Sequence, residues 1–251
     1  MDLGLADRVF VLTGASKGLG FATAQALVAD GARVVVSSRD QSQVDAAVAA
    51  LGGEAHAAGL AADLGDAATP DRLVEAATER FGRFDGALIS VGGPDGGTAA
   101  GKTDDEWRDA FETIFLGSVR AARVFAAALP DGGAIALVLS TSARSPLAGL
   151  GLSNGLRPGL AGVAKDMADE YGPRGVRFIS LLPGRFLTDR NKSLLAASGD
   201  ADKAKAAAGV PLGRIGAPEE FGRVAAFALS PAASYLTGIM LPVDGGALRM
   251  L

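Results

Sequence analysis

The chain has 251 residues, a formal net charge of -4, no cysteine and a single histidine. These values exclude a disulfide framework and argue against a metal site, and the acidic balance gives no electrostatic basis for binding nucleic acid or an anionic membrane. No apolar run approaches membrane-spanning length and no basic region with an apolar core opens the chain, so we expect a cytoplasmic protein.

Residues 8–20, RVFVLTGASKGLG, predict a buried strand that enters a glycine-rich turn and then a helix. Free N–H groups at such a helix start attract phosphate. The first glycine permits a tight turn, the second a close approach to a pyrophosphate, and the third close packing of the helix on the sheet. The alternative is an ordinary glycine-rich turn between a strand and a helix. The cofactor interpretation assigns Gly14, Ser16, Lys17, Gly18, Leu19 and Gly20 to the phosphate site.

The second predicted strand, residues 32–38, ends where the adenosine ribose lies in a dinucleotide-binding fold. Sites for NAD commonly carry an acidic residue there, whereas this chain has Ser38 and Arg39. Since Arg39 together with Lys17 suits a 2′-phosphate, we expect NADP(H) in preference to NAD(H). Alternatively, Arg39 and Asp40 are solvated charges that open the helix over residues 41–52.

The next predicted strands precede further candidate contacts with a cofactor. A weak strand over residues 56–60 is followed by Asp63 and Leu64. Asp63 is placed to accept from the adenine amino group, with Leu64 against the ring; equally, Asp63 caps a helix that begins near Thr69. A clear strand over residues 84–91 precedes Gly92, which lets the chain turn close to a ligand.

The remaining elements continue the alternation of strand and helix. Ser140 stands at the carboxyl end of a predicted strand, where ligands bind in open parallel sheets. An alanine- and lysine-rich stretch, residues 190–208, suits a mobile flap over a site. The pattern predicts an α/β fold with one doubly wound parallel sheet of the Rossmann type, in a single domain over residues 1–251. The expected helices cover residues 104–129, 158–171 and 218–229, and the expected strands cover residues 134–139, 176–182 and 239–243.

Six motifs make the chain resemble the short-chain dehydrogenase/reductase family over nearly its whole length: TGASKGLG (13–20), PRGVRF (173–178), LPG (182–184), PLGRIGAPEEFG (211–222), SYLTG (234–238) and VDGG (243–246). The resemblance implies a Rossmann-type oxidoreductase that transfers hydride between NAD(P)(H) and an alcohol or carbonyl. It also implies a homotetramer or dimer, formed through the long helices, and a small-molecule substrate. It places Pro183, Gly184 and Thr188, together with Gly92, around the nicotinamide.

The resemblance also shows where the chain departs from the family's catalytic pattern. Family members use a tyrosine as acid, a lysine four residues later, a serine thirteen residues before the tyrosine, and an asparagine in an earlier helix. These positions fall on Ser153, Arg157, Ser140 and Ile114, so only the serine is retained. A serine hydroxyl is a far weaker acid than a phenol. Because Pro158 belongs in the first turn of a helix, we expect that Ser153 and Arg157 do not share a helical face.

Three functions fit this pattern. In the first, which we prefer, an NADP(H)-dependent oxidoreductase uses Ser140 to hold the substrate oxygen, Ser153 or a water to relay the proton, and Arg157 to bind the ribose. The second is a cofactor-binding protein without hydride transfer, and the third is another reaction, such as elimination or isomerisation, on the same fold. Small residues over 145–152, with Leu194 and Leu195 in the flap, favour an apolar carbonyl substrate. Five other residues are close enough along the fold to replace the missing tyrosine, or else they only cap helices or lie in solvated loops: Arg144, Asn154, Arg185, Asp189 and Arg190.

Overall fold

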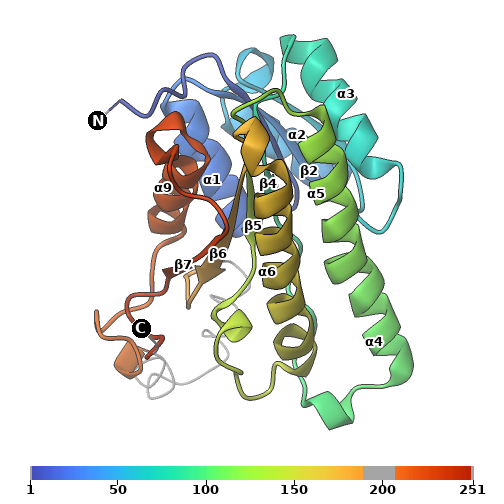
Figure 1. The fold of residues 1–251 in the computed structure, drawn as a ribbon, viewed down its shortest axis with the longest axis vertical. Helices are drawn as coiled ribbons and strands as arrows, with labels where there is room; N and C mark the ends of the chain where they lie inside the picture. Colours follow the sequence, from blue (N-terminus) through green and yellow to red (C-terminus); the bar gives the residue numbers. More distant parts are fainter. Residues whose placement is uncertain (1, 189–206, 250–251) are drawn as a thin grey trace.

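A computed structural model describes residues 2–188 and 207–249 of the chain. Their strands form one seven-stranded sheet in the order β3-β2-β1-β4-β5-β6-β7, with every neighbouring pair parallel (Figure 1). The predicted α/β fold with a doubly wound parallel sheet is therefore confirmed. The strands are β1 (Val9–Leu12), β2 (Arg33–Ser38), β3 (Ala57–Ala61), β4 (Gly86–Ile89), β5 (Ala134–Val138), β6 (Arg177–Pro183) and β7 (Ile239–Val243).

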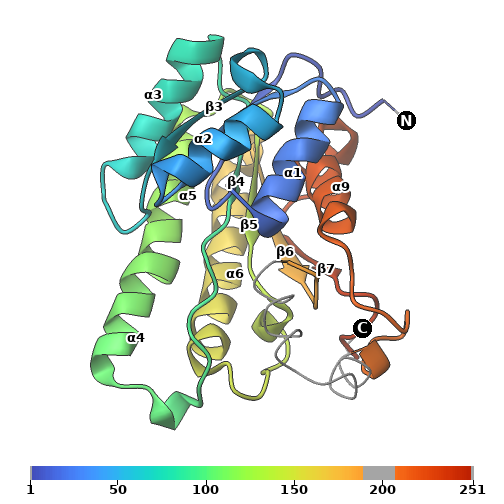
Figure 2. The ribbon, with the colours of Figure 1, turned by 180° about the vertical axis from the view of Figure 1, so that it is seen from behind.

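Helices cover both faces of this sheet, and each face has its own apolar core (Figures 1 and 2). Within β1, Val9 and Val11 point into one core while Phe10 and Leu12 point into the other, which explains why the strand is apolar at every position. The first core is closed by α3 (Thr69–Phe81), α5 (Gly117–Ala128) and α6 (Gly151–Tyr171), and the second by α1 (Gly18–Ala29), α2 (Gln41–Ala50) and α9 (Pro218–Leu229).

The topology indicates where a ligand site is expected. From β1 the chain builds β2 and β3 on one side and then crosses to β4 on the other side. In open parallel sheets, the crevice beyond the carboxyl ends of the strands at such a switch point is the ligand site. The turn after β1 and the loops after β4, β5 and β6 all meet at this crevice.

The predicted helix over residues 104–129 is one continuous helical stretch with an irregular centre. It comprises α4 (Asp104–Ala110), a π-helical segment η3 (Phe111–Leu116) and α5. Ile114, which the resemblance places at the family's asparagine position, is buried inside the π-helical segment. Ile114 therefore packs in the apolar core at the point where the helix is irregular.

The prediction that a helix begins at Pro158 is wrong. Helix α6 begins at Gly151 and carries Pro158 in its interior, where proline removes a backbone donor and crowds the preceding turn. Tertiary contacts outweigh this cost: Leu152 and Leu156 are buried in the core, and the Gly151 N–H donates to the Gly97 carbonyl at 2.9 Å. Ser153 and Arg157 consequently lie one turn apart on the same helix.

The predicted flap covers residues 190–208 and contains Leu194 and Leu195. Its residues 190–206 lie outside the described part of the chain. In the described parts of the chain, no helix combines the length and the apolar character needed to cross a bilayer.

Candidate functional site

The turn after β1 requires glycine at the predicted positions. Gly14 has a φ of +56° and Gly18 one of +61°. A Cβ at Gly14 would lie 2.5 Å from the Ser90 carbonyl oxygen, and one at Gly20 would lie 2.6 Å from the Gly14 carbonyl oxygen. Thr13 ties the turn to the end of β4, since its Oγ1 donates to the Ser90 carbonyl and accepts from the Ser90 N–H, both at 2.9 Å. The turn is thus held tightly against the neighbouring strand.

The helix that follows this turn is ready to bind an anion. Its N-cap residue, Lys17, has extended backbone and makes no capping hydrogen bond with its side chain, and the first turn of α1 holds no acidic residue. Its first N–H groups therefore carry the positive end of the helix dipole, and no carboxylate in this first turn offsets it. A Cβ at Gly18 would lie 3.6 Å from Cγ2 of Thr188, so the predicted phosphate turn and the segment after β6 lie side by side. Ser16 and Leu19 are both half-buried in this turn.

At the end of β2, the acidic side chain is engaged and the basic one is not. Asp40 caps α2: its carboxylate accepts from the Gln43 N–H at 3.2 Å and from the Ser42 hydroxyl at 2.7 Å, and these bonds lower the pKa of Asp40. Arg39 is exposed, and its side chain has no ion pair or hydrogen bond with any described residue. Ser38 is half-buried and donates to the Asp40 carbonyl at 3.3 Å. A helix-opening role thus holds for Asp40.

Asp63 does not cap the helix that begins at Thr69. The N-cap of α3 is Ala68, and the Asp63 carboxylate instead accepts from the Gly65 N–H at 2.9 Å on the exposed loop after β3. The physical reason is that Asp63 lies six residues before Thr69, where its carboxylate closes a local turn with Gly65 and not the first turn of α3. Leu64 is buried in the core, and its carbonyl accepts from Arg120 at 3.3 Å.

The two predicted glycines at the nicotinamide end have different surroundings. A Cβ at Gly92 would meet nothing within 4 Å, whereas one at Gly184 would lie 2.7 Å from Cβ of Asp244. The Gly184 N–H donates to the Val243 carbonyl at 2.9 Å, which continues the pairing beyond Pro183 at the end of β6. Gly184 is thus required by close packing, while Gly92 leaves space beside the loop after β4.

Three serine hydroxyls gather beyond β5, and one of them was not predicted. Ser140 begins the short helix η4 (Thr141–Ala143), and its Oγ accepts from the Ser142 N–H at 3.0 Å. The Oγ atoms of Ser142 and Ser153 are 2.9 Å apart, within hydrogen-bonding distance. Ser142 is 2% exposed and Ser153 is 6% exposed. Ser153 therefore contacts Ser142 rather than Ser140. The sequence signal that could have identified Ser142 is the run of three hydroxyl residues at positions 140–142.

Arg157 is a buried cation without an acidic partner among the described residues. It is 3% exposed, its Nη1 donates to the Val138 carbonyl at 2.9 Å, and its Nε has no hydrogen-bond partner in the described part of the chain. Burial alone lowers the pKa of Arg157, to about 10, so it stays charged at neutral pH. Arg177, also buried, differs because its guanidinium donates to three carbonyls, those of Ala228, Ser230 and Leu236.

Asn154 holds a loop in place. Its Oδ1 accepts from the Leu147 N–H and its Nδ2 donates to the Leu147 carbonyl, both at 2.9 Å. The same loop pairs with the loop after β4 through a bond from the Gly97 N–H to the Gly149 carbonyl at 2.7 Å. Arg185 is exposed, and Asp189 and Arg190 lie outside the described residues.

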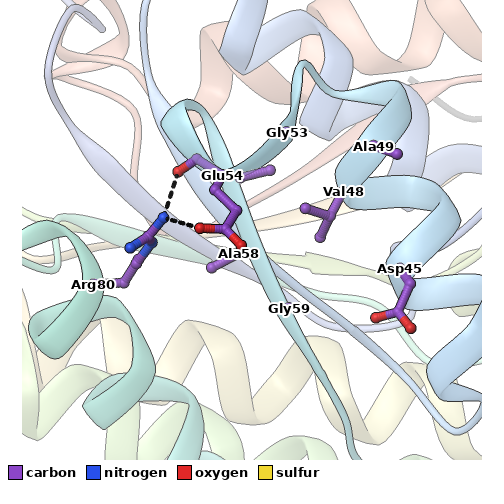
Figure 3. Close-up of a pocket in the computed structure, with 9 residues that line it drawn as sticks. Asp45, Val48, Ala49, Gly53, Glu54, Ala58, Gly59 and Arg80 are labelled. Atoms are coloured by element: carbon purple, nitrogen blue, oxygen red, sulfur yellow. Dashed lines mark hydrogen bonds and ion pairs between the residues drawn. The ribbon is translucent and has the colours of Figure 1, made fainter.

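Two cavities lie away from the crevice. The larger, about 550 Å³, is at the outer edge of β3, where Arg80 donates to the carboxylate of Glu54 at 2.7 Å (Figure 3). The other, about 490 Å³, lies between α6, β6 and β7 and is lined in part by Arg144. No group of acidic or histidine side chains among the described residues is arranged to hold a metal ion. The predicted site residues after β1, β2, β4, β5 and β6 instead meet at the carboxyl edge of the sheet.

Comparison with known proteins gives consistent similarities. A family described as enoyl-(acyl carrier protein) reductase matches residues 14–247. The human mitochondrial dehydrogenase/reductase SDR family member 2 is 34% identical over 259 residues, covering 98% of this chain and 88% of that protein. Dehydrogenase/reductase SDR family member 4 of Oryctolagus cuniculus is also 34% identical, with coverages of 97% and 94%.

Two solved structures share the fold over nearly the whole chain. A short-chain dehydrogenase/reductase from Brucella melitensis, described as a glucose/ribitol dehydrogenase, has a TM-score of 0.92 and 28% identity, with full coverage of both chains, 100% each. An NADPH-bound short-chain oxidoreductase from Pseudomonas aeruginosa PAO1, described as containing an atypical catalytic center, has a TM-score of 0.90 and 29% identity. The match covers 97% of this chain and 98% of that one.

Proposed function

Because this chain belongs to the short-chain dehydrogenase/reductase family, a family of oxidoreductases that bind nicotinamide cofactors, we propose that it is an NADP(H)-dependent oxidoreductase. Its proposed reaction is reduction of a carbonyl group in a small organic compound, or oxidation of the corresponding alcohol. The observation that carries the proposal is the glycine turn at the start of α1, which has no side-chain cap from Lys17 and is followed by a first helical turn without an acidic residue. Such a helix start is suited to a pyrophosphate.

The residues present fit the cofactor at both ends of the crevice. The turn over Gly14 and Gly18 would hold the pyrophosphate, with Ser16, Leu19 and Gly20 completing it. Asp63 and Leu64 follow β3 where the adenine is expected. At the other end, the open space beside Gly92, together with Pro183, Gly184 and Thr188 at and after the end of β6, would hold the nicotinamide.

The choice of NADP(H) over NAD(H) rests on the end of β2. The Asp40 carboxylate, the obvious acceptor for a ribose hydroxyl, already accepts from Gln43 and Ser42. Arg39 and Lys17 are exposed and make no ion pair with a described residue. Two unengaged cations and an engaged carboxylate favour a 2′-phosphate over a 2′-hydroxyl.

When bound, the nicotinamide supplies or accepts a hydride at the carbonyl carbon. The chain's own part is to hold the carbonyl oxygen and to compensate its negative charge. Ser140 is half-buried at the end of β5, and its hydroxyl would donate a hydrogen bond to that oxygen. Arg157 brings a fixed positive charge to the same end of β5 through its bond to Val138, which offsets charge on the oxygen and offers donors to a ribose hydroxyl.

We propose further that this site works without the family's usual tyrosine and lysine, since the matching positions hold Ser153 and Arg157. The Pseudomonas aeruginosa neighbour, which is described as containing an atypical catalytic center, was solved with NADPH bound. It therefore supports the proposal that a site without the family's usual catalytic residues binds the cofactor. A homotetramer or dimer formed through α5 and α6 is also proposed. Light scattering on the purified protein would test the assembly.

Nucleotide binding and turnover together test the proposed function. We expect NADPH to bind more tightly than NADH, as measured by nicotinamide fluorescence, and to be consumed with at least one member of a panel of ketones, aldehydes and enones. Arg39→Ala should weaken NADPH binding but not NADH binding. Arg33→Ala is the matched control, because Arg33 lies at the opposite end of β2 and pairs with Asp7. Failure to bind either nucleotide would refute the proposal, and binding without consumption would favour a cofactor-binding protein.

A further inference from the structure

The three serines beyond β5 differ in what their hydroxyls can reach. Ser142 and Ser153 are almost fully buried and their Oγ atoms lie 2.9 Å apart, so one hydroxyl donates a hydrogen bond to the other. Ser140 is half-buried and is the first residue to leave the strand end. Of these three hydroxyls, the one at Ser140 is the most accessible to a substrate oxygen.

We propose that Ser142 and Ser153 are positioning residues that hold Ser140 in its reactive place, and that Ser153 does not donate the proton of the reaction. This inference rests on the proposed function. It assigns Ser142 a role that the motif did not predict, and of the two expected proton relays, Ser153 or a water, it keeps the water and gives Ser153 an anchoring role. The proton then comes from water at the open side of Ser140.

The geometry links the buried pair to Ser140 in two steps. The Ser142–Ser153 hydrogen bond joins η4 to the first turns of α6, and α6 is itself fixed against the sheet by buried leucines. The Ser142 N–H then donates to the Ser140 Oγ at 3.0 Å. Because this bond occupies a lone pair of Ser140, it directs the hydroxyl proton away from η4 and strengthens it as a donor. A substrate oxygen would receive that proton as a hydrogen bond.

The chemistry of serine supports the same division of roles. Serine is not among the side chains that ordinarily titrate in proteins, and a general acid works best with a pKa near the operating pH. In the proposed reduction, the carbonyl carbon gains a hydride with its electron pair, the π pair moves to the oxygen, and the oxygen takes a proton from water. The cofactor is oxidised to NADP⁺, and the hydroxide left from water returns to the solvent.

Kinetics on single variants distinguish positioning from proton donation. We expect Ser142→Ala and Ser153→Ala to lower kcat roughly ten- to hundredfold through misplacement of Ser140. The KM for NADPH, the pH profile and the solvent deuterium isotope effect should stay as in the wild type. Ser142→Thr, which keeps the hydroxyl, should restore most of kcat. Ser118→Ala is the matched control, since Ser118 is 1% exposed and lies on α5. A changed isotope effect or pH profile in Ser153→Ala would overturn the proposal.

A double-mutant cycle tests the anchoring pair without any turnover. The free energies of unfolding of Ser142→Ala, Ser153→Ala and the double variant should be non-additive, because either single change already breaks the one bond between the hydroxyls. Additive values would refute the pair. If the wild type binds NADPH but reduces no carbonyl, the proposed function fails, while the cycle still decides whether Ser142 and Ser153 anchor η4 to α6.

Discussion

Replacing Arg157 by methionine tests whether this cation serves the fold or the site. Methionine keeps much of the aliphatic length but removes the charge and all donors. With the residues that the structure describes, Arg157 makes a single hydrogen bond, to the Val138 carbonyl, and its Nε has no partner. A buried charge with so few partners contributes little to stability, because desolvation opposes its interactions. We therefore expect Arg157→Met to fold with nearly unchanged stability.

The magnitude follows from the pKa and the hydrogen bond. Burial lowers the pKa of Arg157 to about 10, which at roughly 1.4 kcal/mol for each pKa unit means that burial disfavours the charged form by about 3 kcal/mol. Methionine removes this penalty but also removes one hydrogen bond to a charged group, worth about 1.5–3 kcal/mol. The two effects nearly cancel, so the free energy of unfolding should change by less than about 2 kcal/mol.

Arg177→Met is the matched comparison. Burial also lowers the pKa of Arg177 to about 10, but this side chain donates to the carbonyls of Ala228, Ser230 and Leu236. Loss of these three hydrogen bonds should outweigh the relief of desolvation and cost roughly 2–5 kcal/mol, although the Ser230 carbonyl keeps the Ala233 N–H as a donor. Urea unfolding followed by circular dichroism, at one fixed protein concentration, measures both variants.

The stability and the activity of Arg157→Met are expected to separate. The variant should keep its unfolding midpoint and lose at least about tenfold in kcat/KM, since a charge that compensates a developing oxyanion is missing. If Arg157→Met destabilises the protein as much as Arg177→Met does, Arg157 is a structural cation and the reasoning is refuted.

Three further changes have defined outcomes. Gly14→Ala, at a φ of +56° and with a Cβ 2.5 Å from a carbonyl, should cost roughly 1–3 kcal/mol of stability and abolish NADPH binding in a fluorescence titration. A Cβ at Gly92 would meet nothing within 4 Å, so Gly92→Val should keep the unfolding midpoint of the wild type. The same variant should raise the KM for NADPH, because the added side chain fills space proposed for the nicotinamide. Hydrogen bonds from Arg214 and a backbone N–H lower the pKa of Glu220 to about 2, so its stabilisation is complete above the ordinary glutamate pKa and is lost as pH falls through about 2. Glu220→Gln should therefore be less stable than the wild type in urea at pH 7, with a difference that shrinks toward pH 2; a constant difference would contradict this.

The fold and the phosphate turn were predictable because their signals are local. A short apolar run followed by glycines marks β1 and its turn, and both Gly14 and Gly18 have the positive φ that makes glycine necessary. Alternating strands and helices leave few topologies once crossovers are right-handed. Strand β7 was predicted with the bounds that the structure shows, residues 239–243.

The reacting end of the site was harder to predict because it depends on packing. Proline is a local signal that a helix starts. Because Leu152 and Leu156 are buried in the core, however, α6 begins at Gly151 and Pro158 lies in its interior. The contact between Ser142 and Ser153 joins two elements across a loop, and neither residue type nor spacing specifies which of three neighbouring hydroxyls turns inward. Only the tertiary structure distinguishes them.

The two ends of the site differ in what holds them, and this makes binding and turnover separable. At the phosphate end the backbone itself is constrained, since a side chain at Gly14 would collide with the Ser90 carbonyl. At the proposed reacting end the contacts are made by side chains, so substitutions at residues 153 and 157 need not disturb the turn after β1. Retention of the phosphate turn therefore supports cofactor binding alone. Evidence for hydride transfer has to come from Ser140 and Arg157, whose removal should lower turnover more than it lowers NADPH binding.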